Sequence, residues 1–279
     1  MLRKFFDLFI FSSCYIALCA VLMIWQTGRL LPGVYPSGRL MGFVFFSTIC
    51  SYNFHWYLSS DPKKPSRRTF WTQHHKVMHF ILYLVGAVGA VIYFFSLYQH
   101  WLALCFGAFV TFLYSAPKLP QPFFRNLKRI AVGKTLFLAF VWMYVTTMLP
   151  VFIAGAHWTA PCLLFVFSRF FLIYAICILF DYRDRDDDKA EGIRSLITYL
   201  NEQGIDTIFI ISLLLFAAAT VGLYFYQYPV ITIILLLIPG VILAALYRRA
   251  KKDLSDQLYY FVLDGLMMFS GLLMLILGI

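Results

Sequence analysis

The sequence predicts an all-α membrane protein, with a single integral domain over residues 1–279 and nine transmembrane helices. Composition gives the first reason. The 279 residues are 62% hydrophobic and only 13% charged, whereas soluble domains have roughly 45–50% apolar and about 25% charged residues. The apolar residues also recur in runs of about 17–24 residues, which is the length that a helix needs to cross a bilayer.

The expected spans follow one another at short intervals. They are residues 5–25, 40–58, 77–98, 101–116, 131–153, 158–180, 205–226, 228–247 and 257–278. We expect the first to be a retained span, because a signal peptide has a shorter apolar core and a small-residue cleavage site. The six cysteines lie inside these runs without metal-ligand or redox spacing, so we expect small core residues and no disulfides.

The loops on the two sides of the expected spans differ in charge. Short uncharged links lie near 98–101, 155–158 and 226–229, whereas the loops on the other side are longer and hold most of the 23 Lys and Arg residues. Because positive charge is retained in the cytoplasm, we expect the N-terminus inside and the C-terminus outside. The net charge of +10 then indicates topology and attraction to anionic lipids. Nucleic acid is not an expected partner, because the cations lie beside membrane spans.

An acidic stretch follows the sixth span. It reads "FDYRDRDDDKAEGIRS" from residue 180 to 195 and holds six of the 13 acidic residues. On a continuing helix Asp181, Asp184 and Asp188 form one stripe at intervals of three and four, whereas Asp186 points away. Stacked carboxylates repel one another near a membrane, and a divalent cation removes that penalty. Hard oxygen ligands suit Mg²⁺, which usually binds through one or two carboxylates plus substrate phosphates.

A second interpretation of the acidic stretch stays open. The carboxylates also fit a solvated acidic turn, in which Arg185 pairs with Asp181 and with Asp188. The position of the stripe, at the membrane boundary and before the "GIRS" break, favours the cation site.

The stretch "DYRDRDDDKAEGIRSL" resembles the second aspartate-rich motif of the UbiA superfamily of membrane prenyltransferases. That motif is D-x-x-D-x-x-x-D, followed by a tail of four residues. The tail is Gly, then Ile or Lys, then Lys or Arg, then Ser or Thr. The match has no gaps and places these residues on the motif: Asp181, Asp184, Asp188, Gly192, Arg194 and Ser195. The segment "LYSAPKLP", which contains Tyr114 and precedes Lys134, is similar to the family's Tyr-Ser-x-Pro segment after the fourth span. The resemblance implies nine helices around a central cavity that opens to the cytoplasm, in a membrane of the bacterial inner-membrane type.

The first aspartate motif of the family, N-D-x-x-D-x-x-x-D, has a divergent counterpart here. In "NFHWYLSSD" Asn53 and Asp61 take the first and last places, but Phe54 and Tyr57 stand where aspartates are expected. Asn53, Tyr57 and Asp61 are expected on one working face of the helix, with His55 about 200° away and therefore no substitute ligand. Tyr57 can hydrogen-bond a phosphate but is a poor Mg²⁺ ligand. Packing contacts alone and an altered substrate site both remain open for this segment.

For an active enzyme, the resemblance implies transfer of a prenyl group from a prenyl diphosphate to an aromatic or other lipophilic acceptor. It implies Mg²⁺ at Asp181, Asp184 and Asp188, and a catalytic role for Asp184, Asp188 and Lys134. The implied substrate-binding residues are Asn53, Asp61, Arg67, Arg68, Tyr114 and Arg194. Arginine forks suit phosphate geometry, whereas a plain positive-inside loop explains Lys63 and Lys64 equally well.

The divergent first motif supports a second hypothesis. A catalytically inactive homologue would keep the fold and one acidic site, and would bind a lipid or serve as a partner subunit. Phe54 and Tyr57 favour this hypothesis, whereas the intact second motif and the basic loops favour the enzyme. A transporter has little support, because the sequence shows no inverted repeat or pair of broken helices.

A few polar residues interrupt the apolar runs. Arg169 and Asp264 lie inside expected spans, where charges usually face the protein interior or a cavity. We favour a structural role for Arg169 and leave Asp264 open. In "HHKVMH", His75 and His79 have a spacing that can bind a metal, but interfacial histidines at the start of the third span are the preferred interpretation.

Overall fold

The structure is a computed structural model that describes residues 2–59, 66–115, 134–190 and 195–279. In these segments the regular elements are helical and no strand occurs, as the sequence predicted. The elements are α1 (Leu2–Phe11), α2 (Cys14–Leu30), α3 (Gly38–Tyr57), α4 (Arg67–His74), α5 (Lys76–Ser96), η1 (Tyr98–His100), α6 (Trp101–Ser115), α8 (Lys134–Met143), η4 (Tyr144–Met148), α9 (Leu149–Ala154), α10 (Ala160–Ala190), α11 (Leu196–Tyr199), α12 (Glu202–Gly222), η5 (Leu223–Tyr226), α13 (Val230–Ala250), η6 (Leu258–Leu263) and α14 (Asp264–Leu277).

The helices indicate a multi-pass membrane protein. Within the described residues, six are long and apolar enough to cross a bilayer, and the bent pair α1 and α2 gives a seventh span if it is counted as one. The bend of 60° in this pair corrects the expectation of one continuous first helix. It lies at Ser13, whose φ of 69° is in the left-handed region that interrupts a helix. The α6 helix has only 15 residues, fewer than the roughly 20 of a typical span, so the count of nine spans stays a prediction.

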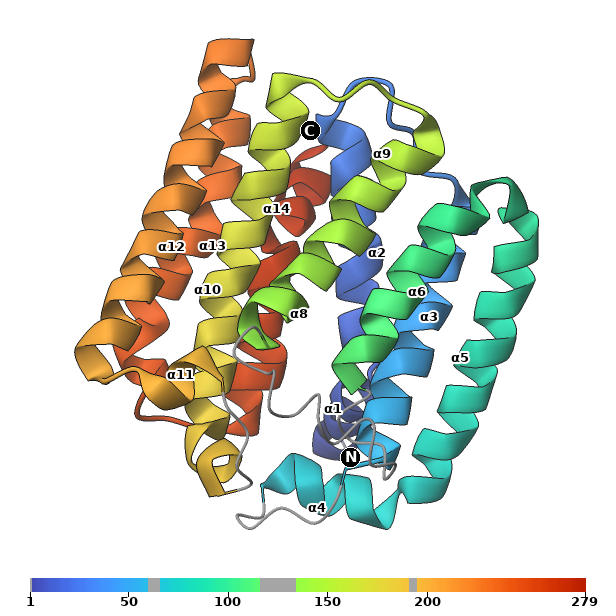
Figure 1. Cartoon of the computed structure of the whole chain (residues 1–279), viewed down its shortest axis with the longest axis vertical. Helices are drawn as coiled ribbons and strands as arrows, with labels where there is room; N and C mark the ends of the chain where they lie inside the picture. The colour runs from blue at the N-terminus through green and yellow to red at the C-terminus, as the bar shows by residue number, and fades with distance from the viewer. Residues whose placement is uncertain (1, 60–65, 116–133, 191–194) are drawn as a thin grey trace.

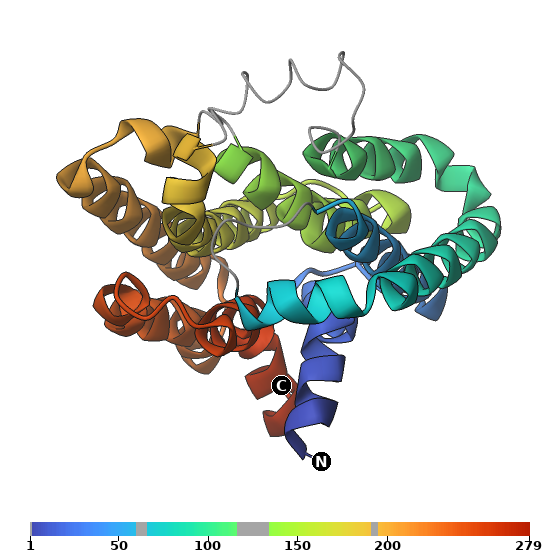
Figure 2. The same cartoon turned by 90° about the horizontal axis from the view of Figure 1, so that it is seen from below.

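The long helices stand side by side in one bundle (Figure 1). α3 packs along α5, α10 packs against α8 and α12, and α2 contacts α3 and α14. From below, α12 and α13 lie at one edge of the bundle and α5 at the other (Figure 2). We call the lower end in Figure 1, which carries α1, α4 and α11, the α4 end; the chain finishes at the opposite end.

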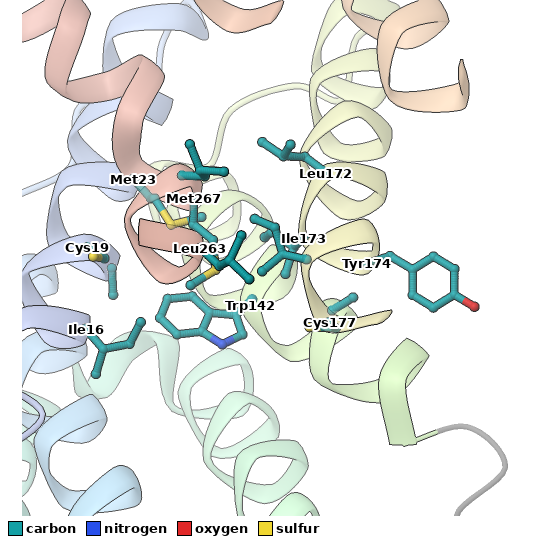
Figure 3. Packing of buried hydrophobic residues seen from close by; sticks show 14 of the residues in the cluster. Ile16, Cys19, Met23, Trp142, Leu172, Ile173, Tyr174, Cys177, Leu263 and Met267 are labelled. Atoms are coloured by element: carbon teal, nitrogen blue, oxygen red, sulfur yellow. The ribbon is translucent and has the colours of Figure 1, made fainter. Parts of the chain in front are cut away.

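The centre of the bundle is filled by side chains from several helices. Trp142 of α8 lies among Ile16 of α2, Leu263 of η6 and Ile173 of α10 (Figure 3). These residues are at most 7% exposed, so their packing holds the four segments together, although Ile16 and Trp142 also line the cavity described below. The six cysteines are all free, as predicted, but Cys105 is exposed and is therefore not the core residue that we expected.

Two glycines allow α5 to approach α3 closely. A Cβ atom on Gly86 would lie 2.5 Å from the backbone nitrogen of Cys50, and one on Gly89 would lie 2.4 Å from the ring of Phe46. Small residues permit such close approach between membrane helices. The α3–α5 pair forms one wall of the cavity described below, so these glycines help to set the position of that wall.

Replacing Gly86 with alanine should therefore push α5 away from α3. We expect G86A to lose about 1–3 kcal/mol of stability, the usual range for overpacking, measured as a lower Tm in detergent. G38A is the matched control, because a Cβ atom on Gly38 meets nothing within 4 Å. Equal Tm values for the two variants would contradict this account.

Candidate functional site

A cavity of about 570 Å³ lies inside the bundle, within the range of roughly 300–1,000 Å³ that is typical of small-molecule sites. Its walls come from α2, α3, α5, α6, α8, α10 and α14, and most of its lining side chains are apolar or aromatic. The charged side chains among the described lining residues are Arg68, Asp181, Asp184 and Asp264. The cavity therefore combines a long apolar wall with a small number of charged groups.

The cavity also reaches the outer surface of the bundle. Val91 of α5 and Phe112 of α6 line it and are 53% and 41% exposed, and the lining residue Cys105 is exposed as well. Several residues of α5 and α6 are therefore both exposed and part of the cavity lining.

The acidic stripe lies on one continuous helix, as the sequence predicted, because α10 extends to Ala190. Asp181 and Asp184 line the cavity, and the Thr135 hydroxyl donates a hydrogen bond to Asp181. Asp188 is buried but is not among the described residues that line this cavity. The structure thus brings two of the three predicted carboxylates to the cavity wall.

The two cavity carboxylates fit a magnesium ion only in part. In the described segments no three His, Cys, Asp or Glu side chains lie close enough together to hold a metal ion. Mg²⁺ usually binds through one or two carboxylates and completes its shell with water and substrate phosphates. Asp181 and Asp184 fit this role, provided that a ligand in the cavity supplies further oxygen atoms.

Arg185 makes contacts that the sequence did not predict. Its guanidinium donates to Glu202 Oε1 at 2.7 Å and to the Leu200 carbonyl at 2.9 Å. Arg185 thereby joins α10 to the beginning of α12. The solvated-turn interpretation had assigned this side chain to Asp181 and Asp188.

Arg68 points into the cavity from α4. Ser66 and Thr69 form a reciprocal cap at the start of this helix, so Arg68 is held in its first turn. The side chain is 3% exposed, and its Cζ atom lies 4.0 Å from the ring centroid of Trp56 and 4.1 Å from that of Tyr260. Burial lowers the pKa of Arg68. Its Nε atom has no hydrogen-bond partner among the described residues.

Asp256 anchors the elements around Arg68. One carboxylate oxygen accepts a hydrogen bond from the Arg68 backbone nitrogen at 2.7 Å, and the other accepts one from Arg183. The Arg183 guanidinium lies 5.0 Å from the ring of Tyr259 and 4.9 Å from that of Tyr260. Both tyrosines belong to the π-helical turn η6, and such turns are frequent at functional sites. Asp256 thus joins α4, α10 and the start of the last span.

Asn53 lies away from the cavity. It is fully buried, and its amide donates to the carbonyls of Ser12 at 3.0 Å and Ile49 at 2.8 Å. Its carbonyl oxygen bonds Nδ1 of His79 at 2.7 Å. These contacts hold α3 against the α1–α2 bend and α5. His79 is fully buried here, which corrects its expected interfacial position.

The cavity face of α3 is not the face that we predicted. His55 and Phe54 line the cavity, whereas Asn53 and Tyr57 are not among its lining residues. Tyr57 instead packs against Phe80 of α5, with ring centroids 5.5 Å apart. Asn53 and His55 do lie on different sides of α3, as the angle of about 200° predicted. The side that carries His55 faces the cavity, however, and not the side that carries Asn53.

The remaining predicted site residues are placed as follows. Arg67 forms an ion pair with Asp7 of α1 and is not among the described cavity residues. Asp61 and Arg194 lie outside the described residues, as do the side chains of Tyr114 and Lys134.

Arg169 has a structural role, which confirms the favoured interpretation. Its guanidinium donates to the carbonyls of Met23 and Thr146 and to the side chains of Gln26, Thr27 and Thr147, at 2.7–3.1 Å. The Thr146 carbonyl lies in the π-helical turn η4 and also accepts a bond from Thr27 at 2.7 Å. Arg169 therefore joins α2, η4 and α10 through neutral acceptors.

The match to known proteins agrees with this architecture. Residues 72–272 match the model of the UbiA prenyltransferase family, which is more than half of the chain. This chain belongs to that family. The match confirms the family that the acidic stretch predicted. Members of this family are generally membrane prenyltransferases.

A solved UbiA homologue has a similar fold. The apo structure of a UbiA homologue from Aeropyrum pernix K1 superposes with a TM-score of 0.63 at 17% sequence identity, over 96% of this chain and 97% of that chain. At this identity the likeness concerns the fold alone. No curated protein sequence matches the chain.

Sequence reasoning missed residues whose partners are distant in the chain. Asp256 contacts Arg68 and Arg183 from 188 and 73 residues away. No local pattern marks it, because it stands in an ordinary polar stretch at the start of the last helix. Thr135 likewise bonds Asp181 from 46 residues away, although its position next to the predicted Lys134 was a usable signal.

Removing the Asp256 carboxylate should loosen this end of the bundle. D256A would leave the Arg183 charge buried without its partner, and breaking a buried pair in this way costs about 3–5 kcal/mol. We expect a clear drop in Tm in detergent and faster proteolysis near α4. R249A is the control, since the exposed Arg249–Asp253 pair should contribute at most about 1 kcal/mol. A D256A variant as stable as R249A would rule out the anchoring role.

Proposed function

We propose that this UbiA-family chain is a Mg²⁺-dependent prenyltransferase, which transfers a prenyl group from a prenyl diphosphate to an aromatic or other lipophilic acceptor. The observation that carries the proposal is the cavity itself. It places the carboxylates of Asp181 and Asp184 and the guanidinium of Arg68 in one cavity whose remaining walls are mostly apolar. A prenyl diphosphate has the same division into a charged head and a long apolar tail.

The apolar walls suit the tail of such a substrate. Leu138 and Trp142 of α8, Val145 of η4, and Ile176 and Phe180 of α10 all line the cavity. Burial of a CH₂ group contributes about 0.8 kcal/mol, so a chain of several isoprene units gains substantial affinity there. The exposed lining residues of α5 and α6 give such a chain a route from the bilayer.

The charged groups suit the head. Asp181 and Asp184 are the residues that would hold Mg²⁺, with Asp188 a further candidate that is implied by the motif. A bound ion would neutralise the negative charge of the diphosphate leaving group. The carbon–oxygen bond then breaks with its electron pair on the diphosphate, the acceptor forms the new bond, and its displaced proton leaves to water. The ring of Phe54 lines the cavity and can stabilise an allylic cation through its π face, whereas Trp56 and Tyr260 already contact the Arg68 guanidinium.

We also propose that the α4 end faces the cytoplasm. In the described residues Arg67 and Arg68 begin α4, which lies at this end, and positive charge is retained on the cytoplasmic side. A diphosphate made in the cytoplasm would then reach Arg68 and the α10 carboxylates directly.

Neutralising Asp184 should weaken Mg²⁺-dependent binding of geranyl diphosphate. Loss even of an outer partner of a metal ligand costs about 10–100-fold, so we expect at least a tenfold loss for D184N in titration calorimetry with nanodisc protein. D186N is the matched control, because Asp186 lies on the same exposed stretch but is not among the cavity residues. Wild-type protein that shows no Mg²⁺-dependent binding would end the enzyme proposal.

One feature favours the alternative of an inactive homologue that binds a lipid or a partner subunit. Phe54 and Tyr57 pack against Tyr83 and Phe80 of α5, with ring centroids 5.2 and 5.5 Å apart. Where carboxylates were expected, this chain has aromatic packing between two helices.

The double variant F54D/Y57D separates the two hypotheses. Turnover of geranyl diphosphate with a panel of phenols, followed by release of diphosphate, is the measurement. If the wild type is active, the double variant should be less stable and no more active, because the substitutions break the packing of α3 on α5. Turnover that appears only in the double variant would instead identify the natural chain as an inactive descendant of an enzyme.

A further inference from the structure

The cavity wall carries one carboxylate that the proposed reaction does not yet use. Asp264 begins α14, directly after the π-helical turn η6, and it lines the cavity together with Tyr260 and Met267. These residues follow one another at intervals of four and three, so they lie on one face of the last span. Because Asp181 and Asp184 are the residues that would hold the cation, Asp264 is the remaining carboxylate of the described lining.

Asp264 lies farther from the α4 end than the carboxylates of α10. The ring of Tyr260 packs against Phe180 of α10 with centroids 5.8 Å apart, which places these two residues at the same level. α10 runs towards the α4 end, whereas α14 runs away from it (Figure 1). Asp181 and Asp184 therefore lie on the α4 side of Phe180. Asp264 lies four residues beyond Tyr260 in the opposite direction, which is about 6 Å along a helix.

This level of the cavity is the apolar layer next to the charged groups. Trp142 and Cys177 line the cavity there, and Figure 3 shows them near Leu263 and Met267, which flank Asp264 in the sequence. The reacting carbon of a prenyl diphosphate is bonded directly to the diphosphate, so an acceptor has to lie beside the head and not at the far end of the tail. A carboxylate one helical turn from the level of the head is therefore in the layer where an acceptor has to bind.

The protein leaves the carboxylate of Asp264 without a hydrogen-bond donor. Within the described part of the chain, no group donates a hydrogen bond to it or forms an ion pair with it. The nearby hydroxyl of Tyr15 donates to the Phe261 carbonyl at 2.8 Å, and Arg68 acts on Asp264 only as a charge at a distance. Burying a polar group without a hydrogen bond is unfavourable. This part of the cavity therefore favours a ligand that brings a donor group.

We propose that Asp264 binds the hydroxyl group of the acceptor and is the general base that takes its proton. The acceptor O–H bond breaks, the proton moves to a carboxylate oxygen of Asp264, and the electron pair stays on the acceptor, which bonds to the allylic carbon. The diphosphate leaves with the electron pair of the carbon–oxygen bond, and Asp264 then releases the proton to water. The acceptor class is thus a phenol or another lipophilic hydroxyl compound. The proposal rests on the proposed function for the prenyl donor, whereas the hydrogen bond to the acceptor does not require turnover.

The variant D264N tests the catalytic step, because it keeps the shape of the side chain and removes the proton acceptor. Full-length protein in nanodiscs is assayed with geranyl diphosphate, Mg²⁺ and para-propylphenol. We expect kcat to fall about a hundredfold or more, the usual contribution of a general base, while Mg²⁺-dependent binding of geranyl diphosphate persists. With para-cyanophenol the loss should be smaller, because this more acidic phenol gives up its proton more easily. D253N is the control and should match the wild type, because Asp253 is exposed and lies outside the described lining.

A second variant keeps the test open if D264N does not fold. D264E retains the charge but displaces the carboxylate by one CH₂ group, so we expect a lower kcat with the Tm of the wild type. H55Q tests the histidine of the α3 wall as a rival base. A wild-type rate in D264E, an equal loss with both phenols in D264N, or a larger loss in H55Q than in D264N would each overturn the proposal.

A binding measurement makes the test independent of turnover. Saturation-transfer NMR gives the affinity for para-propylphenol in the absence of a prenyl donor. We expect D264N to bind this phenol about tenfold more weakly, the value of a hydrogen bond to a charged group, and D253N to bind it as the wild type does. Equal affinities in D264N and the wild type would refute the acceptor site. Binding that depends on Asp264 in a protein that turns over no prenyl diphosphate would uphold the site and refute the prenyl function.

Discussion

The arrangement of the charged cavity depends on one buried carboxylate, that of Asp256. It bonds the first turn of α4 through the Arg68 backbone and α10 through Arg183, and it lies just before η6 and α14 in the chain. These three segments supply every charged side chain that the described cavity lining contains. A single residue thus fixes the relative positions of groups that come from distant parts of the sequence. The aromatic residues of η6 complete the arrangement, because the ring of Tyr260 contacts both Arg68 and Arg183.

Arg169 is a second buried guanidinium, but its hydrogen-bond partners are neutral and include no carboxylate among the described residues. Arg169 is surrounded by carbonyl, amide and hydroxyl oxygens of α2 and the α8–η4 segment, and it is only 4% exposed. Its position in a span predicted a protein partner, but not that the partners would be neutral. The π-helical turn η4 contributes here, since the Thr146 carbonyl accepts bonds from both Arg169 and Thr27. Arg169 is satisfied by protein atoms, whereas the buried Nε of Arg68 has no hydrogen-bond partner among the described residues.

The sequence predicted what is encoded locally. The apolar runs predicted helices, and the spacing of Asp181 and Asp184 predicted that they share a face, because both depend on neighbours within two turns. It did not predict the rotation of α3, which follows from the bonds of Asn53 to Ser12 and His79 on two other segments. A spacing rule states which residues share a face, but only tertiary packing decides which face is inside. The bend at Ser13 was missed for a similar reason, since the apolar run continues through it without interruption.

The contacts of the Arg68 guanidinium with the rings of Trp56 and Tyr260 also have an entropic consequence. An arginine side chain carries about 2 kcal/mol of rotamer entropy, and a free one loses much of it when a ligand immobilises it. Here the loss has already occurred during folding, so a ligand would meet a receptor that is rigid before contact. Such pre-organisation increases affinity without any new interaction, and it makes the site intolerant of ligands whose charged group cannot reach the guanidinium.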